Sequence, residues 1–298
     1  MIEITIKSYM PRVSLIKGKA RRENVWRSLD LIADDIKKGL ASRQPVIKPN
    51  FVSSTVQLAS SHIDQIRGIL DFLSSFYDGK IIIAEAACYD TMEAYHNFGY
   101  MNLLKEYNVE LLDLNIGPYD MVPIIGRDNK SIVVGVSSLL LDKDNFIISA
   151  AKMKTHDTVV VTLAVKNMAV GSIVRRDKKA VHQGLRKTNM NIAGLAGLVW
   201  PDLAVIDGFE GMEGDGPTGG DPVRLNLAMA SIDALATDRV ACEIMGIDFQ
   251  SVGYLHYCAE KGLGEADLKK IKVLGERVID CVRPFRLHRA VNEQYVWK

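Results

Sequence analysis

Cationic side chains stand on both sides of an apolar stretch in the middle of the chain. Residues 158–165 (TVVVTLAV) are apolar or β-branched enough to be buried. The flanking polar residues are Lys152, Lys154 and His156 on one side and Lys166 and Asn167 on the other. An ammonium group without a partner is costly to bury, so the folded protein must bring either water or an anion to these side chains. We interpret the segment as part of an anion site, with a solvated surface as the alternative for any single lysine.

Polar residues of the same kind follow other short β-rich runs. In open parallel sheets, ligands bind beyond the carboxyl ends of the strands, because the loops there converge on one crevice. The residues in question are Lys48 and Asn50 after residues 45–47, Glu85 after residues 80–84, Lys152, Lys154 and His156 after residues 145–150, and Asp207 after residues 203–206. Strand ends are also polar simply because they meet water, and that interpretation stays open. The pattern favours cations and carboxylates facing one another in a single crevice.

Such a crevice could hold an anion and move a proton. Histidine is the side chain that titrates near neutral pH without perturbation, which favours His156 as the acid or base. A metal-ligand role or a structural hydrogen bond remains an alternative for each histidine. We predict two groups of site residues. The catalytic group is His156, Lys154, Glu85 and Asp207, and the substrate-binding group is Lys48, Asn50, Lys152, Lys166, Asn167 and His182.

A glycine-rich segment, residues 207–221 (DGFEGMEGDGPTGGD), interleaves carboxylates with six glycines. Glycine lets a ligand approach the main chain closely, and carboxylate oxygens suit a hard cation such as Mg²⁺ or Ca²⁺. The spacing matches neither an EF-hand nor a phosphate-binding P-loop. We predict Glu210, Glu213 and Asp215 as metal ligands, with a mobile acidic loop as the alternative. A divalent metal is thus one cofactor that the sequence suggests, and any other cofactor is left open.

A basic run precedes His182. It contains Arg175, Arg176, Lys178 and Lys179, and it borders the predicted crevice. We interpret residues 172–184 as a loop or lid that closes on an anionic substrate. Nucleic-acid binding is the alternative, but aromatic residues do not interleave with the cations, and the net charge of the whole chain is only +1.

The order of elements predicts the fold that positions these residues. Short β-rich runs alternate with amphipathic segments of helical length, which is typical of an α/β fold: a mostly parallel sheet with helices on both faces. Within this order we expect an edge strand at residues 2–6, a helix at 24–40, an inserted β-hairpin at 119–138, a helix at 157–169 and a glycine-rich loop at 209–222. With Thr155 or Asp157 as its N-cap, the helix at 157–169 would point free N–H groups at the crevice. We expect one α/β domain over residues 1–298.

Cysteine usage and hydropathy exclude several classes of protein. Cys88, Cys242, Cys258 and Cys281 are scattered without a CxxC pair, which argues against a zinc ribbon, an iron–sulfur cluster or a dense disulfide framework. We interpret all four as buried small apolar side chains. The first residues lack the pattern of a secretory signal, and no run is apolar enough to span a membrane. We therefore expect a cytoplasmic protein with no membrane partner.

Several motifs together resemble the DUF362 family, a bacterial and archaeal group of unknown function. They are KPNF at residues 48–51, Glu85 with FGY at 98–100, KMKTH at 152–156, TLAVKNM at 162–168, DGFEGMEGDGP at 207–217 and ASIDALATD at 230–238. The resemblance implies a single α/β domain without an established chemistry. Some members carry a ferredoxin-like module with iron–sulfur clusters, but this chain lacks the cysteine motifs, so no cluster is expected in it.

These observations lead to three hypotheses of function. The first is an enzyme that acts on a small anionic metabolite, a carboxylate or a phosphate, by acid/base or metal-assisted chemistry. The second, which rests only on the ferredoxin-bearing relatives, is a protein that works with a redox partner. The third is a nucleic-acid binder that uses the basic run.

Overall fold

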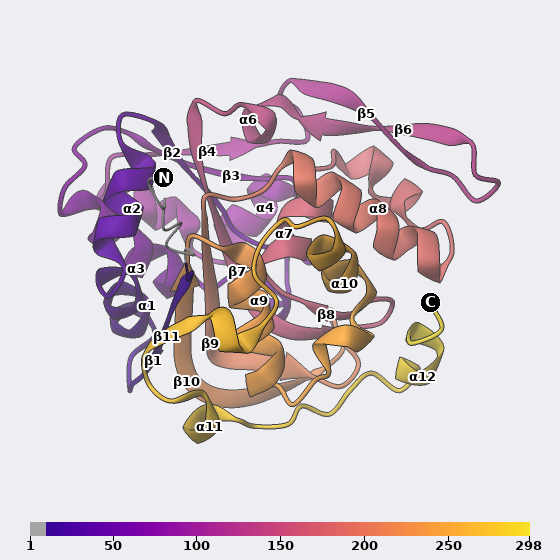
Figure 1. Cartoon of the computed structure of the whole chain (residues 1–298). Coiled ribbons are helices and arrows are strands. Elements are labelled where there is room, and N and C mark those ends of the chain that lie inside the picture. The colour runs from indigo at the N-terminus through magenta and orange to yellow at the C-terminus, as the bar shows by residue number, and fades with distance from the viewer. Residues whose placement is uncertain (1–9) are drawn as a thin grey trace, which may run out of the picture.

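The computed structural model describes residues 10–298. Within this range a nine-stranded mixed sheet has the strand order β11-β1-β10-β9-β7-β2-β3-β4, with β8 paired to β7 (Figure 1). The strands of this sheet are β1 (Arg12–Lys17), β2 (Gln44–Lys48), β3 (Ile81–Glu85), β4 (Val109–Asp113), β7 (Asn145–His156), β8 (Val160–Thr162), β9 (Leu203–Glu213), β10 (Asp221–Ser231) and β11 (Lys272–Gly275).

Helices surround the sheet. The α-helices are α1 (Arg21–Asp30), α2 (Ala33–Leu40), α3 (Ile63–Ser74), α4 (Thr91–Asn97), α5 (Leu103–Glu106), α6 (Ser138–Leu141), α7 (Ala164–Gly171), α8 (Leu185–Leu198), α9 (Ala234–Ile244), α10 (Gly253–Glu260), α11 (Val278–Cys281) and α12 (Val291–Gln294). The short 3₁₀ helices are η1 (Gln57–Ala59), η2 (Tyr100–Asn102), η3 (Arg175–Val181), η4 (Phe249–Ser251) and η5 (Leu268–Lys270). None of the helices in residues 10–298 is both long and apolar enough for a membrane span.

The pairing of the strands confirms the predicted α/β class. Strand β2 pairs in parallel with β3 and β7, and the pairs β3–β4, β7–β9 and β1–β11 are also parallel. The antiparallel pairs are β1–β10, β9–β10 and β7–β8. The carboxyl ends of β2, β3 and β7 therefore meet at one edge of the sheet, where the polar residues of the sequence gather.

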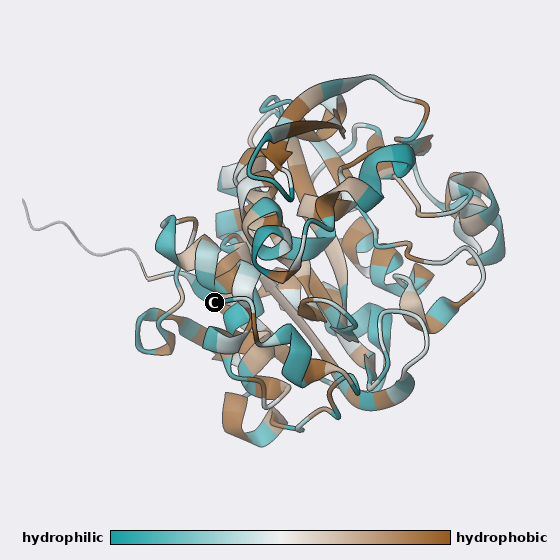
Figure 2. Cartoon of the chain, turned by 90° about the vertical axis from the view of Figure 1, so that its right-hand side faces the viewer, coloured by the Kyte–Doolittle hydropathy of each residue, from teal (hydrophilic) through white to brown (hydrophobic). Residues whose placement is uncertain are grey.

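Successive residues of the central strands face opposite cores. Val46 packs in one hydrophobic cluster and Ile47 in the other, and Ile147 and Ile148 divide in the same way. Helices α1 to α3 cover one of these clusters and α7 to α10 the other, and the hydropathy colours alternate along the outer helices (Figures 1 and 2). Burial on both faces explains why these strands read as continuous apolar runs.

The predicted hairpin is present. Strands β5 (Tyr119–Ile125) and β6 (Ser131–Ser137) pair antiparallel outside the main sheet, and β5 lies beside α8 (Figure 1). Its turn uses residues that favour turns: the Asp128 carboxylate accepts the N–H of Lys130, and Asn129 adopts a positive φ of 66°.

The helix predicted at residues 157–169 is wrong in its first half. Strand β7 continues through His156, and β8 returns antiparallel to it before α7 begins at Ala164. The β-branched run in residues 158–162 favours extended structure, and the pairing with β7 satisfies its backbone. The first two N–H groups of α7 are not available to a crevice either, because the two oxygens of Asp238 accept the N–H groups of Ala164 at 2.9 Å and Val165 at 3.0 Å.

Two other expectations differ from the structure, and a third falls outside the described residues. The glycine-rich loop is shorter than residues 209–222, because β9 continues to Glu213 and β10 begins at Asp221. Glycine is needed within that strand, since a Cβ at Gly211 would lie 2.9 Å from the Met153 carbonyl oxygen. The helix at residues 24–40 is divided into α1 and α2. The strand predicted at residues 2–6 lies outside the described residues, and β1 follows it at a place where no strand was predicted.

Candidate functional site

A cavity of about 510 Å³ lies at the carboxyl ends of β2, β3 and β7. Loops after β2 and β3, the end of β7, α7, η3 and the turn between β9 and β10 contribute to its wall. The polar side chains in the wall that can do chemistry include the carboxylates Glu85 and Asp157, and also Asn50, His156, Lys166, Lys178 and His182. The structure thus brings together five of the predicted site residues with Lys178 of the basic run, and it adds Asp157.

A buried hydrogen-bond network supports this wall. The Lys48 ammonium group donates to Glu85 Oε2 at 2.7 Å and to Asn167 Oδ1 at 3.1 Å, and Asn50 Nδ2 donates to the same Asn167 oxygen at 3.1 Å. Burial raises the pKa of Glu85, whereas the neighbouring Lys48 opposes that rise. A Cβ at residue 171 would displace the end of the Lys48 side chain from its present position.

Two lysines reach the cavity without a carboxylate partner. Lys166 Nζ contacts Thr162 Oγ1 at 3.4 Å, and Lys178 Nζ donates to the Val170 carbonyl at 2.8 Å. Neither ammonium group forms an ion pair with another described residue. Burial lowers the pKa of each lysine to about 8, and the charges of Asp157 near Lys166 and of Glu85 near Lys178 oppose that fall only in part. Both lysines remain mostly charged at pH 7, and burial is only partly offset by these carboxylates.

His156 is held in the neutral form. Its Nδ1 accepts the N–H of Thr158 at 3.1 Å and also lies 3.0 Å from Asp157 Oδ1. The carboxylate would favour a proton on Nδ1, but the Thr158 N–H requires an acceptor there, and burial with the nearby Lys166 lowers the pKa of His156 to about 3. We therefore assign the proton to Nε2, which makes the ring a hydrogen-bond donor at neutral pH. Burial also lowers the pKa of His182.

Lys154 lies behind the cavity and not in its wall. Its side chain is completely buried and donates to the Ala59 carbonyl at 2.5 Å. Burial, reinforced by the charges of Lys166 and Lys152, lowers the pKa of Lys154 far below its ordinary value. Burial thus disfavours the charged form of Lys154, and the side chain does not line the cavity.

Lys152 and Asp207 form a second, separate cluster. Asp207 Oδ2 lies 3.0 Å from Arg21 Nε and 3.9 Å from Lys152 Nζ, while Oδ1 accepts the N–H of Phe209 at 2.9 Å. Neither residue lines the cavity. No sequence signal placed Arg21 here, because α1 precedes β9 by more than a hundred residues and nothing local indicates the contact. We name this group the Asp207 cluster.

The three carboxylates predicted as metal ligands turn toward basic residues. Glu213 Oε2 accepts the N–H of Arg286 at 3.1 Å, and Asp215 pairs with Arg289 at 2.6 Å. Glu210 lies opposite Arg224 in the β9–β10 register. Across residues 10–298, no group of three or more His, Cys, Asp or Glu side chains has the arrangement of a metal site.

The basic run and one cysteine also belong to the cavity. Arg175, Lys178 and Lys179 line it together with Cys88. Cys88 is exposed, so its interpretation as a buried apolar residue was wrong, whereas Cys242, Cys258 and Cys281 are buried as predicted. The signal for Cys88 was available in the sequence, since it follows the end of β3 by three residues, as the other polar residues follow their strands.

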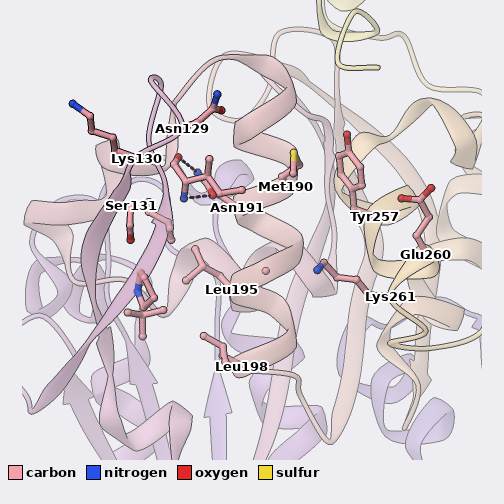
Figure 3. Close-up of a pocket in the computed structure, with 15 residues that line it drawn as sticks. Asn129, Lys130, Ser131, Met190, Asn191, Leu195, Leu198, Tyr257, Glu260 and Lys261 are labelled. Atoms are coloured by element: carbon pink, nitrogen blue, oxygen red, sulfur yellow. Dashed lines mark hydrogen bonds between the residues drawn. The ribbon is translucent and has the colours of Figure 1, made fainter.

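A second hollow of about 620 Å³ lies between β5, α8 and α10 (Figure 3). Its wall is largely apolar, and Asn191 uses its side chain to bond both the N–H and the carbonyl of Ile125. Lys130 and Lys261 supply its positive charge, and both are exposed. None of the predicted site residues lies there.

Comparison with known proteins finds one relative among curated sequences. The thylakoid-associated protein sll1697 of Synechocystis is 29% identical over 157 residues, which cover 51% of this chain and 46% of that protein. The chain thus matches about half the length of this relative.

Two of the solved structures that match this chain show the low level of sequence identity. The lactate racemase apoprotein from Thermoanaerobacterium thermosaccharolyticum is 11% identical with a TM-score of 0.43, over 67% of this chain and 50% of that one. A structural-genomics target from Thermotoga maritima is 11% identical with a TM-score of 0.44, over 64% of this chain and 51% of that one.

The family comparison covers the residues that build the cavity. The profile described as a domain of unknown function, DUF362, matches residues 46–243, from the second strand of the sheet to the end of α9. Since this match spans most of the chain, the protein belongs to the DUF362 family.

Proposed function

We propose that the protein is an enzyme that binds a small anionic metabolite, a carboxylate or a phosphate, in the cavity at the carboxyl edge of the sheet. The observation that carries the proposal is the pair Lys166 and Lys178, which are buried in one wall without a carboxylate partner. Keeping an ammonium group charged in such a place is costly unless an anion accompanies it. An anion between the two would compensate both charges at once.

Other groups of the wall fit the same ligand. His156 supplies a neutral N–H donor and Arg175 a permanent cation, whereas Lys48 already neutralises the Glu85 carboxylate. Hydrogen bonds from charged donors to an anion are among the strongest in proteins. Lys166, Lys178, Lys179 and Arg175 outnumber Asp157, which is the carboxylate of the wall that Lys48 does not neutralise. The wall therefore attracts a small anion, although the net charge of the chain is close to zero.

The same two lysines are the best candidates for proton transfer. A general acid or base works best when its pKa lies near the operating pH, and the pKa of each lysine is about 8. His156, with a pKa of about 3, is a poor base at neutral pH. In this proposal Lys166 or Lys178 exchanges a proton with the substrate, and His156 donates a hydrogen bond to it.

The basic run supports a small ligand better than a nucleic acid. Lys178 is buried and bonded to the Val170 carbonyl, and Arg175 donates to the Tyr89 carbonyl at 2.7 Å. Arg176 lies over the ring of Tyr119. The cations of the run thus point in different directions, whereas binding to a phosphate backbone needs several of them on one outer face.

Titration calorimetry with inorganic phosphate and with small carboxylates tests the proposal. We expect binding by the native protein, and a loss of at least about ten-fold in affinity for Lys166→Met and for Lys178→Met, because each removes a charge-assisted hydrogen bond. Lys261→Met, which removes an exposed lysine of the other hollow, is the matched control and should bind as the native protein does. No binding of any anion, or equal loss in the control, would refute the proposal.

The affinity should also depend on pH in a defined direction. A bound anion favours the ammonium form, so the pKa of each lysine rises on binding. Affinity is then constant below about pH 8 and falls above it, because the free lysines have lost protons that the complex requires. Calorimetry between pH 7 and pH 9.5 in buffers of different ionisation enthalpy measures both the fall and the proton uptake. A rise in affinity with pH would contradict the assignment.

A further inference from the structure

Cys88 is the one exposed cysteine among residues 10–298, and it lines the cavity. Cys242, Cys258 and Cys281 are buried and do not line it. A reagent that enters the cavity of the folded protein therefore meets a single thiol within the described part of the chain. An accessible thiol is common on protein surfaces, so its meaning depends on how it is held and on what surrounds it.

The backbone of Cys88 is held from two sides. Its N–H donates to the Phe51 carbonyl at 3.4 Å, and the carbonyl of the next residue, Tyr89, accepts a hydrogen bond from the Arg175 guanidinium at 2.7 Å. The loop between β3 and α4 is thus tied to the loop after β2 and to the start of η3. A side chain on a backbone fixed in this way reaches the same part of the cavity each time.

Cations lie near this thiol. Lys166, Lys178 and Arg175 line the same cavity. Burial lowers the pKa of Lys166 and of Lys178, and a negative charge on the Cys88 sulfur opposes that fall in both; for Lys178 it does so more strongly than the charge of Glu85. The sulfur is therefore close enough to both ammonium groups to share a small ligand with them.

The two ammonium groups have hydrogen-bond donors to spare. Lys166 and Lys178 are each more than nine-tenths buried, and each ammonium group carries three N–H donors. Among the described residues, each has one hydrogen-bond acceptor: Thr162 Oγ1 for Lys166 and the Val170 carbonyl for Lys178. Buried donors without an acceptor call for a partner from outside the chain. This evidence for a bound anion is independent of Cys88.

Cys88 is also the best nucleophile of the wall. Both lysines are mostly protonated at pH 7, because the pKa of each is about 8. The Nδ1 atom of His156 accepts the N–H of Thr158, and its Nε2 carries the proton. Toward carbon, sulfur is intrinsically a stronger nucleophile than a neutral imidazole such as that of His182. An anion held by the two lysines therefore has a reactive sulfur beside it.

We propose that Cys88 is the nucleophile of the cavity and acts on small anions that carry an electrophilic carbon and are held by Lys166 and Lys178. The proposal rests on the anion binding proposed above and narrows its ligand class to anions with such a carbon. In the reaction, the sulfur forms a bond to this carbon. The bond between the carbon and its leaving group breaks, the leaving group departs with that electron pair, and the thiol proton passes to solvent.

Alkylation with iodoacetate and with iodoacetamide tests the proposal, because the two reagents share the electrophilic carbon and the leaving iodide but differ in charge. The readout is the rate constant at Cys88 for iodoacetate divided by that for iodoacetamide, with glutathione as the reference thiol. In the native protein this ratio should exceed that of glutathione by at least about ten-fold, since a cleft lined by cations concentrates anions. The rate with iodoacetate should also saturate as its concentration rises, and inorganic phosphate should slow it by competition.

Variants connect the preference to the residues named. In Lys166→Met and in Lys178→Met the ratio should fall toward that of glutathione, and the saturation should be lost. Lys261→Met, which removes an exposed lysine of the other hollow, is the matched control and should keep the native ratio. Mass spectrometry of the digested protein assigns the label to Cys88. Label on the buried Cys242 reports any unfolded fraction, so a misfolded variant is recognised in the same experiment.

The outcomes separate this proposal from the one on which it rests. If calorimetry detects anion binding but the ratio equals that of glutathione, or phosphate does not slow iodoacetate, anion binding stands and the assignment of Cys88 is overturned. A ratio that persists in both lysine variants would overturn it as well. If calorimetry detects no anion binding and the iodoacetate reaction does not saturate, both proposals fail.

Discussion

Two groups of buried charge at the same edge of the sheet are organised in opposite ways. In the Asp207 cluster, one carboxylate lies between Arg21 and Lys152. In the cavity wall, Lys166 and Lys178 bond only to a hydroxyl and a carbonyl oxygen, and Asp157 and Glu85 act on them from beyond ion-pair distance. The first group has a carboxylate within ion-pair distance of its cations, and the second does not. A buried lysine after a strand is thus no indication of a binding site unless its carboxylate partner is missing.

Strand register explains much of the difference. Lys152 and Asp207 are direct partners in the parallel pair β7–β9, so the ladder itself holds their side chains together. Lys166 comes from the first turn of α7, which contains no carboxylate. Lys178 comes from η3, whose one carboxylate, Asp177, accepts the N–H of Gly135 instead. The Lys48–Glu85 pair shows that the compensated arrangement also occurs beside the cavity.

The largest effect is expected for Asp207→Asn, which breaks the compensated group. The change leaves Arg21 and Lys152 as buried cations without a carboxylate and should lower the free energy of unfolding by about 3 to 5 kcal/mol. Urea denaturation measures this loss. Anion binding in the cavity should persist in the folded variant, because Asp207 does not line it. A loss below about 1 kcal/mol would mean that the cluster is not coupled as described.

A slightly smaller effect is expected from His156 on acidification. Its pKa in the folded protein is about 3, below the ordinary value of 6.5, so the folded state favours the neutral ring. The free energy of unfolding is therefore unaffected by His156 above pH 6.5. It falls as the pH decreases from 6.5 toward 3, because the unfolded chain takes up a proton at this histidine and the folded protein does not. Between pH 6.5 and pH 4 this loss amounts to roughly 3 kcal/mol.

Urea denaturation across that pH range, compared with His156→Gln, isolates the contribution. The variant should lose stability with acid less steeply than the native protein, since only the native chain carries this histidine. His256→Gln is the control, because that ring is partly exposed on α10. Equal slopes for the native protein and His156→Gln would show that His156 is not held neutral.

The fold and the site were predictable to different degrees. Strands such as β2 and β3 and the β5–β6 hairpin follow from local periodicity and turn residues, which the sequence displays directly. The polar residues at the ends of β2, β3 and β7 were found for the same reason, since a strand and its exit are local features. Cys88 follows β3 in the same way and was missed only because cysteine was assumed to be buried.

What could not be predicted depends on contacts between distant segments. The N-terminus of α7 is capped by Asp238, and Arg21 reaches Asp207 from α1, and neither contact has a local signature. The β-branched run before α7 was assigned to the helix, because a short apolar segment does not distinguish a strand from a buried helical turn. The pairing of strands also decides which lysines meet a carboxylate, and the periodicity of the sequence does not predict that pairing.

The smallest effect, and the one that distinguishes the two groups by its sign, is expected for Lys166→Met. The change removes a buried cation whose burial the more distant Asp157 carboxylate offsets only in part, and methionine fills a similar volume with apolar atoms. Because burial lowers the pKa of Lys166 from 10.5 to about 8, the charged form is disfavoured in the folded protein at pH 7. The variant should therefore gain about 1 to 2 kcal/mol in the free energy of unfolding while it loses anion affinity. Urea denaturation at pH 7 without added phosphate measures the gain, and a loss of stability would mean that Lys166 has a compensating partner within the protein. A gain in the free energy of unfolding for Lys166→Met, together with a loss for Asp207→Asn, is the expected pair of results. It would show that the Asp207 cluster depends on its internal carboxylate, whereas the charge of Lys166 is left for a bound anion to compensate.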